Sequence, residues 1–120
     1  MKKAKKINKT KFLRKQRVRK KIKAISQISQ RPRVIVYKSN QYTYAQFVDL
    51  NGKTLFTVSS QMFEKEKKNK TELAKKVGEV LAEKILNLNI KEIVFDRGPY
   101  KYHGRIKAIA EGLREKGLNF

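Results

Sequence analysis

The chain has 120 residues, of which 31 are Lys or Arg and 10 are Asp or Glu, so its formal net charge is +21. It has no Cys and one His, which excludes disulfides, thiolate zinc sites and histidine metal clusters. Its longest purely apolar run, residues 34–37, is far too short to span a membrane. A charge of this size is typical of a protein with a polyanionic partner. The composition therefore predicts a small intracellular nucleic-acid binder with no membrane partner and no small-molecule substrate.

The positive charge is concentrated at the N-terminus. Residues 1–33 hold 15 of the basic residues and no acid, whereas residues 34–120 hold 16 basic and all 10 acidic residues, a net +6. Like charges at this density repel one another, so we expect residues 1–30 to form an extended basic arm and residues 31–120 a globular domain. These thirty residues lack the apolar region of a secretory signal, and they are Lys-rich where organelle transit peptides are Ser-rich.

The arm also carries a weak helical pattern between residues 12 and 28. Its apolar residues approximate one helical stripe, so the arm is expected to become partly helical when RNA neutralises its charge. An amphipathic helix on an anionic membrane, or a merely solubilising tail, is less well supported because the stripe lacks the Trp, Phe and Leu content of interfacial helices. The arm residues predicted to bind RNA are Arg14, Lys15, Arg17, Arg19, Lys20, Lys21 and Lys23.

The globular part begins with predicted strands. Pro32 disfavours a helical conformation at Arg31, so the arm helix is expected to end before it. Residues 34–37 are β-branched and apolar on successive positions, which is typical of a central strand. Residues 39–41 then form a turn.

Two further strands are predicted around a hairpin. Residues 42–49 alternate between two faces, and residues 54–59 pair back as a third strand. Asn51-Gly52 between them predicts a type I′ turn with positive φ at both positions. The first three strands should form an antiparallel meander. The two faces of residues 42–49 are Tyr42, Tyr44, Gln46 and Val48 on one side, and Thr43, Ala45 and Phe47 on the other.

After a charged connector at residues 64–70, the apolar residues recur at the spacing of a helix and no longer at that of a strand. Asn69 stands three residues before Glu72, which is typical of a helix start. Residues 91–96 predict a fourth strand, and residues 105–116 a second helix that Gly117 ends. A strand reached through a helix usually returns parallel. The fold predicted is thus α/β, a mixed sheet of about four strands in the order β-β-β-α-β-α with helices packed on it. The first helix would present Leu73, Val77, Val80, Leu81, Ile85 and Leu88.

The loop between the fourth strand and the second helix has the densest group of charged and aromatic residues. It follows the carboxyl end of a strand, where open α/β sheets often bind ligands, and a helix start near His103 would add free N–H groups for a phosphate. Arg and Lys contact phosphates, Tyr rings stack on unpaired bases, and Gly permits close approach. The RNA contacts predicted here are Arg97, Tyr100, Lys101, Tyr102, His103, Gly104 and Arg105.

Other interpretations of these residues remain open. The loop could be purely structural, with ion pairs around Asp96 and Arg97, although we expect loss of Arg97 or Arg105 to leave stability almost unchanged. Tyr42 and Tyr44 fit core packing as well as they fit stacking on bases.

No catalytic residue, metal ligand or cofactor is predicted. His103 has no Cys to pair with and no recognisable Ser–His–Asp arrangement. Asp49 and Asp96 stand apart from the cluster of acids that a two-metal nuclease needs. The alternative function is a non-specific basic nucleic-acid-binding protein, which would share the charge but would not need a mixed sheet with a Tyr-rich loop.

Several segments together resemble the bacterial large-subunit ribosomal protein family numbered eighteen. The resemblance covers nearly the whole chain, and its most specific parts are the Phe-Asp-Arg and Tyr-His-Gly-Arg motifs. The segments are Arg31-Pro32-Arg33, Ser39-Asn40, Tyr44-Ala45-Gln46, Ala74-Lys75-Lys76-Val77-Gly78, Val94-Phe95-Asp96-Arg97-Gly98, Tyr102-His103-Gly104-Arg105 and Gly117-Leu118-Asn119-Phe120.

The resemblance implies a non-enzymatic constituent of the large ribosomal subunit in the cytoplasm. Such a protein binds 5S ribosomal RNA and helps attach it to 23S ribosomal RNA in the central protuberance, beside neighbouring ribosomal proteins. The resemblance also implies a ribonuclease-H-like fold of the kind found in translation components. Carried over by position, RNA contact is implied for the arm cations and for Arg31, Arg33, Ser39, Asn40, Tyr44, Arg97, Tyr102, His103 and Arg105.

Two residues complete the predicted RNA contacts. Lys38 stands where this family commonly has Arg, so it offers a point charge and not a bidentate donor. Tyr42 follows the predicted turn and shares a strand face with Tyr44.

Overall fold

The computed structural model describes residues 30–120. The elements follow the predicted order, with one addition, the 3₁₀ helix η2, which takes up the start of the predicted connector. The arm and its predicted helix lie outside the described residues. The elements are β1 (Arg33–Lys38), β2 (Thr43–Val48), β3 (Thr54–Ser59), η2 (Ser60–Glu66), α2 (Lys70–Leu86), β4 (Val94–Asp96) and α3 (Gly104–Glu115).

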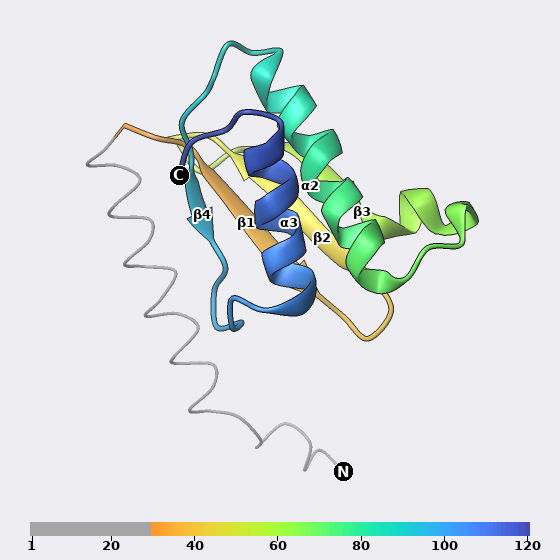
Figure 1. The fold of residues 1–120 in the computed structure, drawn as a ribbon. Helices are drawn as coiled ribbons and strands as arrows, with labels where there is room; N and C mark the ends of the chain where they lie inside the picture. The colour runs from red at the N-terminus through yellow and green to blue at the C-terminus, as the bar shows by residue number, and fades with distance from the viewer. Residues whose placement is uncertain (1–29) are drawn as a thin grey trace.

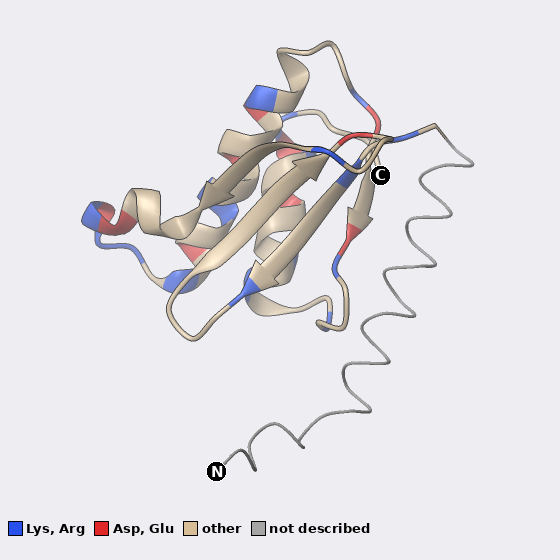
Figure 2. Cartoon of the chain, turned by 180° about the vertical axis from the view of Figure 1, so that it is seen from behind, with Lys and Arg blue, Asp and Glu red and all other residues tan. Residues whose placement is uncertain are grey.

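The four strands form one mixed sheet in the order β3-β2-β1-β4. β2 pairs antiparallel with both β1 and β3, whereas β4 pairs parallel with β1. Figure 1 shows α2 and α3 side by side in front of the sheet, and Figure 2 shows the opposite face of the sheet, which neither α2 nor α3 covers. The described part of the chain therefore has two layers, and the predicted α/β mixed sheet is confirmed.

Strand β2 has the two faces that its alternation predicts as far as Phe47; Val48, predicted on the face of Tyr44, is buried, beside an irregularity in the pairing with β3. Thr43, Ala45 and Phe47 are buried under the helices, while Tyr44 and Gln46 on the other face are half-buried. Because successive side chains of a strand point to opposite faces, the alternation alone decides which residues meet the helices.

The turn between β2 and β3 differs from the prediction. Gly52 has a φ of +86°, but Asn51 has no positive φ, so the turn is not type I′. The Asp49 carboxylate accepts hydrogen bonds from the backbone N–H groups of Asn51 and Lys53, each at 2.9 Å. An Asp at this position closes a turn through its own side chain. These side-chain hydrogen bonds determine the turn conformation in place of the type I′ turn that Asn-Gly predicts. Only Gly52 is then left-handed in this turn.

The core lies between the two helices and the covered face of the sheet. Asn69 caps α2 as predicted, its side chain accepting from the N–H of Glu72 at 2.8 Å. Leu88 was predicted on the buried face but lies beyond the end of α2 and is 45% exposed. The largest fully buried side chains include Phe47, Leu81, Ile85, Ile93, Ile106, Ile109 and Leu113.

Helices α2 and α3 approach closely because each contributes a glycine to their contact. A Cβ atom on Gly78 would lie 2.2 Å from the carbonyl oxygen of Ile109, and one on Gly112 would lie 2.3 Å from that of Lys75. Any larger residue would force the helices apart, since protein interiors have no slack of this size.

The C-terminus returns to the edge strand. Gly117, with a φ of +112°, ends α3 as predicted. Leu118 is buried, and Asn119 forms a parallel bridge with Glu92, just before β4. The last residue, Phe120, is thereby held beside β4.

Candidate nucleic-acid interface

The loop from Arg97 to Arg105 is closed by bonds within itself and to the sheet. The buried carboxylate of Asp96 accepts from the N–H of Gly98 at 2.9 Å and pairs with Arg33 at 3.6 Å. The guanidinium of Arg97 donates to the carbonyl of Tyr100. Ile106, at the start of α3, is fully buried. The loop is therefore anchored at both ends.

The turn between β1 and β2 is bonded to the starts of both helices. Arg105 Nη1 donates to the carbonyl of Ser39 at 2.8 Å and, more weakly, to that of Tyr42 at 3.5 Å. Lys70, the first residue of α2, donates to the carbonyl of Asn40. These bonds bring three segments that are far apart in the sequence to one corner of the molecule.

A groove of about 460 Å³ lies at this corner, and we call it the cationic groove. Four of its lining residues are Lys or Arg, none is Asp or Glu, and the first residues of both α2 and α3 contribute to it. Helix N-termini expose unpaired N–H groups that favour anions, and the four cations add to this potential. The lining residues are Lys38, Lys70, Thr71, Lys101, His103, Gly104 and Arg105.

The starts of the two helices differ in how their N–H groups are satisfied. Asn69 caps α2 with its side chain, but His103, at the corresponding position of α3, makes no capping hydrogen bond and is exposed. The first N–H groups of α3 therefore remain available to water or to an anion.

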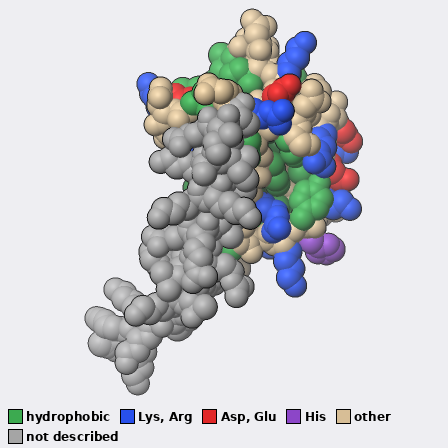
Figure 3. Space-filling model, turned by 90° about the vertical axis from the view of Figure 1, so that its left-hand side faces the viewer, with side chains coloured by type: hydrophobic (Ala, Val, Ile, Leu, Met, Phe, Trp, Pro, Cys, Tyr) green, Lys and Arg blue, Asp and Glu red, His purple; other side chains and the backbone are tan. Residues whose placement is uncertain are grey.

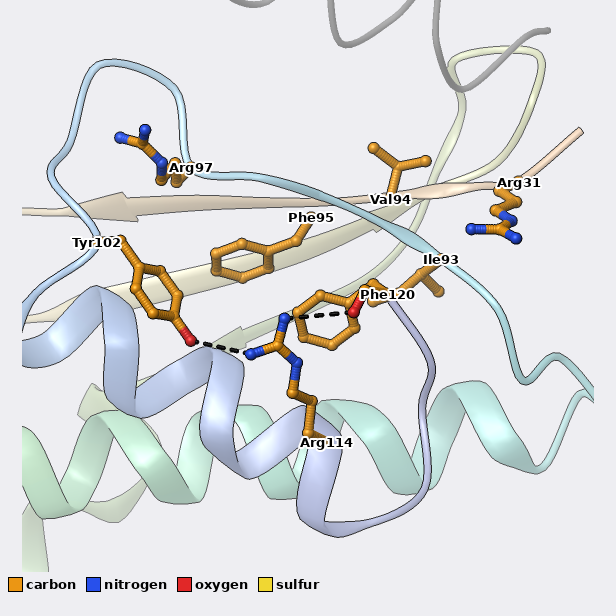
Figure 4. Close-up of a pocket in the computed structure, with 8 residues that line it drawn as sticks. All are labelled: Arg31, Ile93, Val94, Phe95, Arg97, Tyr102, Arg114 and Phe120. Carbon is orange, nitrogen blue, oxygen red and sulfur yellow. Dashed lines mark hydrogen bonds between the residues drawn. The ribbon is translucent and has the colours of Figure 1, made fainter. Parts of the chain in front are cut away.

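A second hollow, of about 520 Å³, is lined by other residues of the same loop; we call it the aromatic hollow (Figure 4). Three aromatic rings and three Arg side chains contribute to it, from the start of β1, from β4, from the loop and from the C-terminal part of the chain. Its lining residues are Arg31, Ile93, Val94, Phe95, Arg97, Tyr102, Arg114 and Phe120.

The predicted tyrosines take different positions. The hydroxyl of Tyr42 donates to Glu64 at 2.9 Å, and this hydrogen bond raises the pKa of Tyr42 above its ordinary value of 10.0. Tyr44 is half-buried on the open face of the sheet, opposite Tyr37. Tyr100 packs against the core beneath Lys38, whose ammonium lies 5.7 Å from the ring centroid. Tyr102 is 40% exposed in the aromatic hollow.

The structure thus separates the predicted contacts into groups. Lys38, Lys101, His103, Gly104 and Arg105 meet in the cationic groove, with Ser39, Asn40 and Tyr42 in the adjoining turn. Arg31, just before β1, pairs with Glu92 at 3.0 Å, and Arg33, the first residue of β1, pairs with Asp96. The arm residues Arg14 to Lys23 lie outside the described residues.

Sequence reasoning missed seven lining residues of the two sites, which are Lys70, Thr71, Ile93, Val94, Phe95, Arg114 and Phe120. Lys70 and Thr71 directly follow the helix cap at Asn69. The predicted cap could therefore have identified them as the first two residues of a helix, where anions bind. Arg114 and Phe120 gave no such signal, because only the return of the C-terminus to β4 brings them to the loop.

Two other kinds of site find no support in the described residues. Between residues 30 and 120, no three His, Asp or Glu side chains gather as metal ligands would. The helices in that range are also not long and apolar enough to cross a bilayer.

Comparison with known proteins identifies the family. The sequence model of the family described as ribosomal L18 of archaea, bacteria, mitochondria and chloroplast matches residues 3–120. The chain is 53% identical over 108 residues to large ribosomal subunit protein uL18 of Thermus thermophilus, covering 89% of this chain and 92% of that protein. It is 48% identical over 116 residues to the protein of the same name from Staphylococcus carnosus, covering 94% of each. The chain belongs to the ribosomal L18 family.

Proposed function

We propose that the chain is a structural, non-catalytic constituent of the large subunit of the cytoplasmic ribosome. In this proposal it binds 5S ribosomal RNA and helps attach it to 23S ribosomal RNA in the central protuberance, beside neighbouring ribosomal proteins. The observation that carries the proposal is the cationic groove, in a chain whose relatives are named large ribosomal subunit protein uL18.

The groove suits an RNA backbone better than it suits a small anion. Its cations come from the end of β1, the start of α2, the loop before α3 and the start of α3, so they are spread over several segments and can meet successive phosphates. The bonds from Arg105 to Ser39 and from Lys70 to Asn40 hold these segments in place before RNA arrives. Preorganised donors lower the entropy cost of binding.

The basic arm has a different role in the proposal. Residues 1–33 carry no acid and half of the basic residues, so we infer that the arm supplies most of the affinity and becomes partly helical on RNA. The globular domain, residues 31–120, supplies most of the selectivity. Deleting residues 1–30 should weaken RNA binding and flatten its salt dependence, because the slope scales with about 0.7–0.9 per neutralised phosphate.

A competition binding assay tests the function. Labelled 5S ribosomal RNA bound to the full chain should be displaced by unlabelled 5S RNA and much less by an equal mass of duplex DNA. Equal displacement by the two competitors would favour the alternative, a non-specific basic nucleic-acid-binding protein. The ribonuclease-H-like character of the fold stays a prediction from the resemblance.

A further inference from the structure

The aromatic hollow is a preformed group of rings beside the loop that also lines the cationic groove. Phe95 and Phe120 stack with centroids 5.4 Å apart. The guanidinium of Arg114 lies 4.3 Å from the Phe120 ring centroid and donates to the Tyr102 hydroxyl at 3.1 Å and to the Phe120 carbonyl at 3.2 Å. Figure 4 shows this guanidinium between the two side chains. One arginine thus fixes two rings from different segments.

The charge of the hollow is positive. Its lining residues include Arg31, Arg97 and Arg114 and no acidic residue; Glu92, just outside, pairs with Arg31. Figure 3 shows the side of the molecule that carries β4, where apolar side chains are exposed among Lys and Arg, with some Asp and Glu side chains between them. A ligand for this surface needs a flat apolar face and a negative charge in the same molecule. A nucleotide has both.

We propose that the aromatic hollow takes one unpaired nucleotide, with its base against the exposed ring of Tyr102 and its phosphate on the arginines at the rim. This proposal rests on the proposed RNA-binding function and adds to it a site for a single-stranded element. A volume of about 520 Å³ falls in the range of small-ligand sites, about 300–1,000 Å³. A base inside a duplex cannot enter, because both of its faces are already stacked.

The position of the hollow favours a nucleotide over a protein segment. A peptide would add to the free edge of β4, but β4 has only three residues, and the C-terminal segment already bridges to Glu92 just before it. The loop also presents Lys101 and His103 to the groove and Arg97 and Tyr102 to the hollow. An RNA strand that passes the loop therefore meets cations that bind phosphate at the groove and aromatic rings that stack on a base at the hollow.

A tryptophan reporter tests this proposal directly in the full chain, which has no Trp of its own. Tyr102→Trp keeps a ring in the hollow, and its fluorescence should be quenched by single-stranded hexaadenylate. Inorganic tripolyphosphate and a double-stranded RNA of the same length should not quench it. Tyr102→Leu should weaken hexaadenylate binding by about 5- to 150-fold, the range expected for one stacked base, and should leave duplex binding unchanged.

Two control variants separate stacking from general damage. Tyr102→Phe loses the bond from Arg114 but keeps the ring, so it should retain most of the hexaadenylate affinity that Tyr102→Leu loses. Phe56→Leu removes a comparable ring from β3, the edge strand farthest from β4. This ring stacks on Phe47, and the Lys84 ammonium lies 5.7 Å from its centroid. The variant should leave the affinity for hexaadenylate unchanged.

The outcomes distinguish this proposal from the function on which it rests. If hexaadenylate does not quench Tyr102→Trp, or if Tyr102→Leu binds it like the parent, the nucleotide site is wrong and the hollow is left for a protein neighbour. If 5S RNA binding by the parent is intact in that case, the proposed function survives. If the parent does not prefer 5S RNA to duplex DNA, the proposed function fails, whatever the reporter shows.

Discussion

Arg105, at the start of α3, donates to the backbone carbonyl of Ser39 at 2.8 Å, although 66 positions separate the two residues. The sequence predicts Arg105 only as an RNA-binding cation of the loop. In the structure its side chain also links the start of α3 to the β1–β2 turn. Arg105 is half-buried, and its second, longer bond reaches Tyr42. These bonds replace the sequence-based expectation that loss of Arg105 leaves stability almost unchanged: its replacement should affect stability as well as binding.

Arg105→Ala should lower the free energy of unfolding by about 1–2 kcal/mol, because a charge-assisted hydrogen bond to a backbone carbonyl is lost. The melting temperature should fall by about 5–10 °C, as expected for a domain of this size. Thermal unfolding followed by circular dichroism measures it. Lys107→Ala, which removes an exposed cation from the same helix, is the control; equal melting of the two variants would contradict a structural role for Arg105.

The contact between α2 and α3 predicts a second effect on stability. Gly78→Ala and Gly112→Ala should each lower the free energy of unfolding by about 1–3 kcal/mol, because the added Cβ meets a backbone carbonyl. The gain in helix propensity, about 1 kcal/mol for Gly→Ala, offsets only part of this. Urea unfolding gives the values. Glu111→Ala, an exposed change beside Gly112, should be nearly neutral; stabilisation by either glycine variant would refute the close contact.

The ion pair of Arg33 and Asp96 predicts a third effect on stability. The Asp96 side chain is fully buried and that of Arg33 is 12% exposed, so Asp96→Asn leaves a poorly solvated cation and should cost about 3 kcal/mol. The double variant Arg33→Met with Asp96→Asn should be less destabilised than the sum of the single variants. A double-mutant cycle in urea provides the measurement, and strict additivity would mean that the two side chains do not interact.

The hydrogen bond between Tyr42 and Glu64 predicts that folding stability depends on pH in the alkaline range. Because its hydrogen bond to Glu64 raises the pKa of Tyr42 in the folded chain, an unfolded tyrosine ionises first as the pH rises. The stability from this bond is complete below about pH 10 and is lost as the pH passes the folded-state pKa. In a phenolate absorbance titration, Glu64→Gln should shift the ionisation of Tyr42 to lower pH, because the hydrogen bond that raises its pKa is lost. A titration curve that Glu64→Gln leaves unchanged would exclude this assignment.

Local sequence patterns were enough to predict most of the fold. Alternation assigned the buried face of β2, and helical spacing with Asn69 and Gly117 gave the bounds of the helices to within a few residues. The β2–β3 turn was wrong because Asp49 bonds the turn through its side chain, which the Asn-Gly signal does not include.

The site was less predictable because its geometry depends on tertiary contacts. Sequence gave the cations of the loop, but only the fold brings Lys70 beside Lys101, or Phe120 beside Tyr102. The same holds for Gly78, whose role depends on a backbone carbonyl of α3. Residue type predicts the chemistry of a site, whereas the partners of each side chain follow from the packing of elements that are distant in the sequence.

If the cationic groove binds the backbone of 5S ribosomal RNA, removing its charges should weaken that binding. The matched control for groove variants is Lys53→Gln with Lys84→Gln, which removes two exposed charges outside the groove. Lys53 lies in the β2–β3 hairpin, at the opposite end of the meander from the β1–β2 turn.

The most direct measurement is the affinity of the full chain for 5S ribosomal RNA over a range of salt concentrations. For Lys70→Gln with Lys101→Gln, the affinity should fall and the slope of log affinity against log salt should decrease by about 1.5, the equivalent of two phosphate contacts. The control pair should match the parent. If the groove variant kept the affinity and salt slope of the parent, the cationic groove would not be the RNA-binding site.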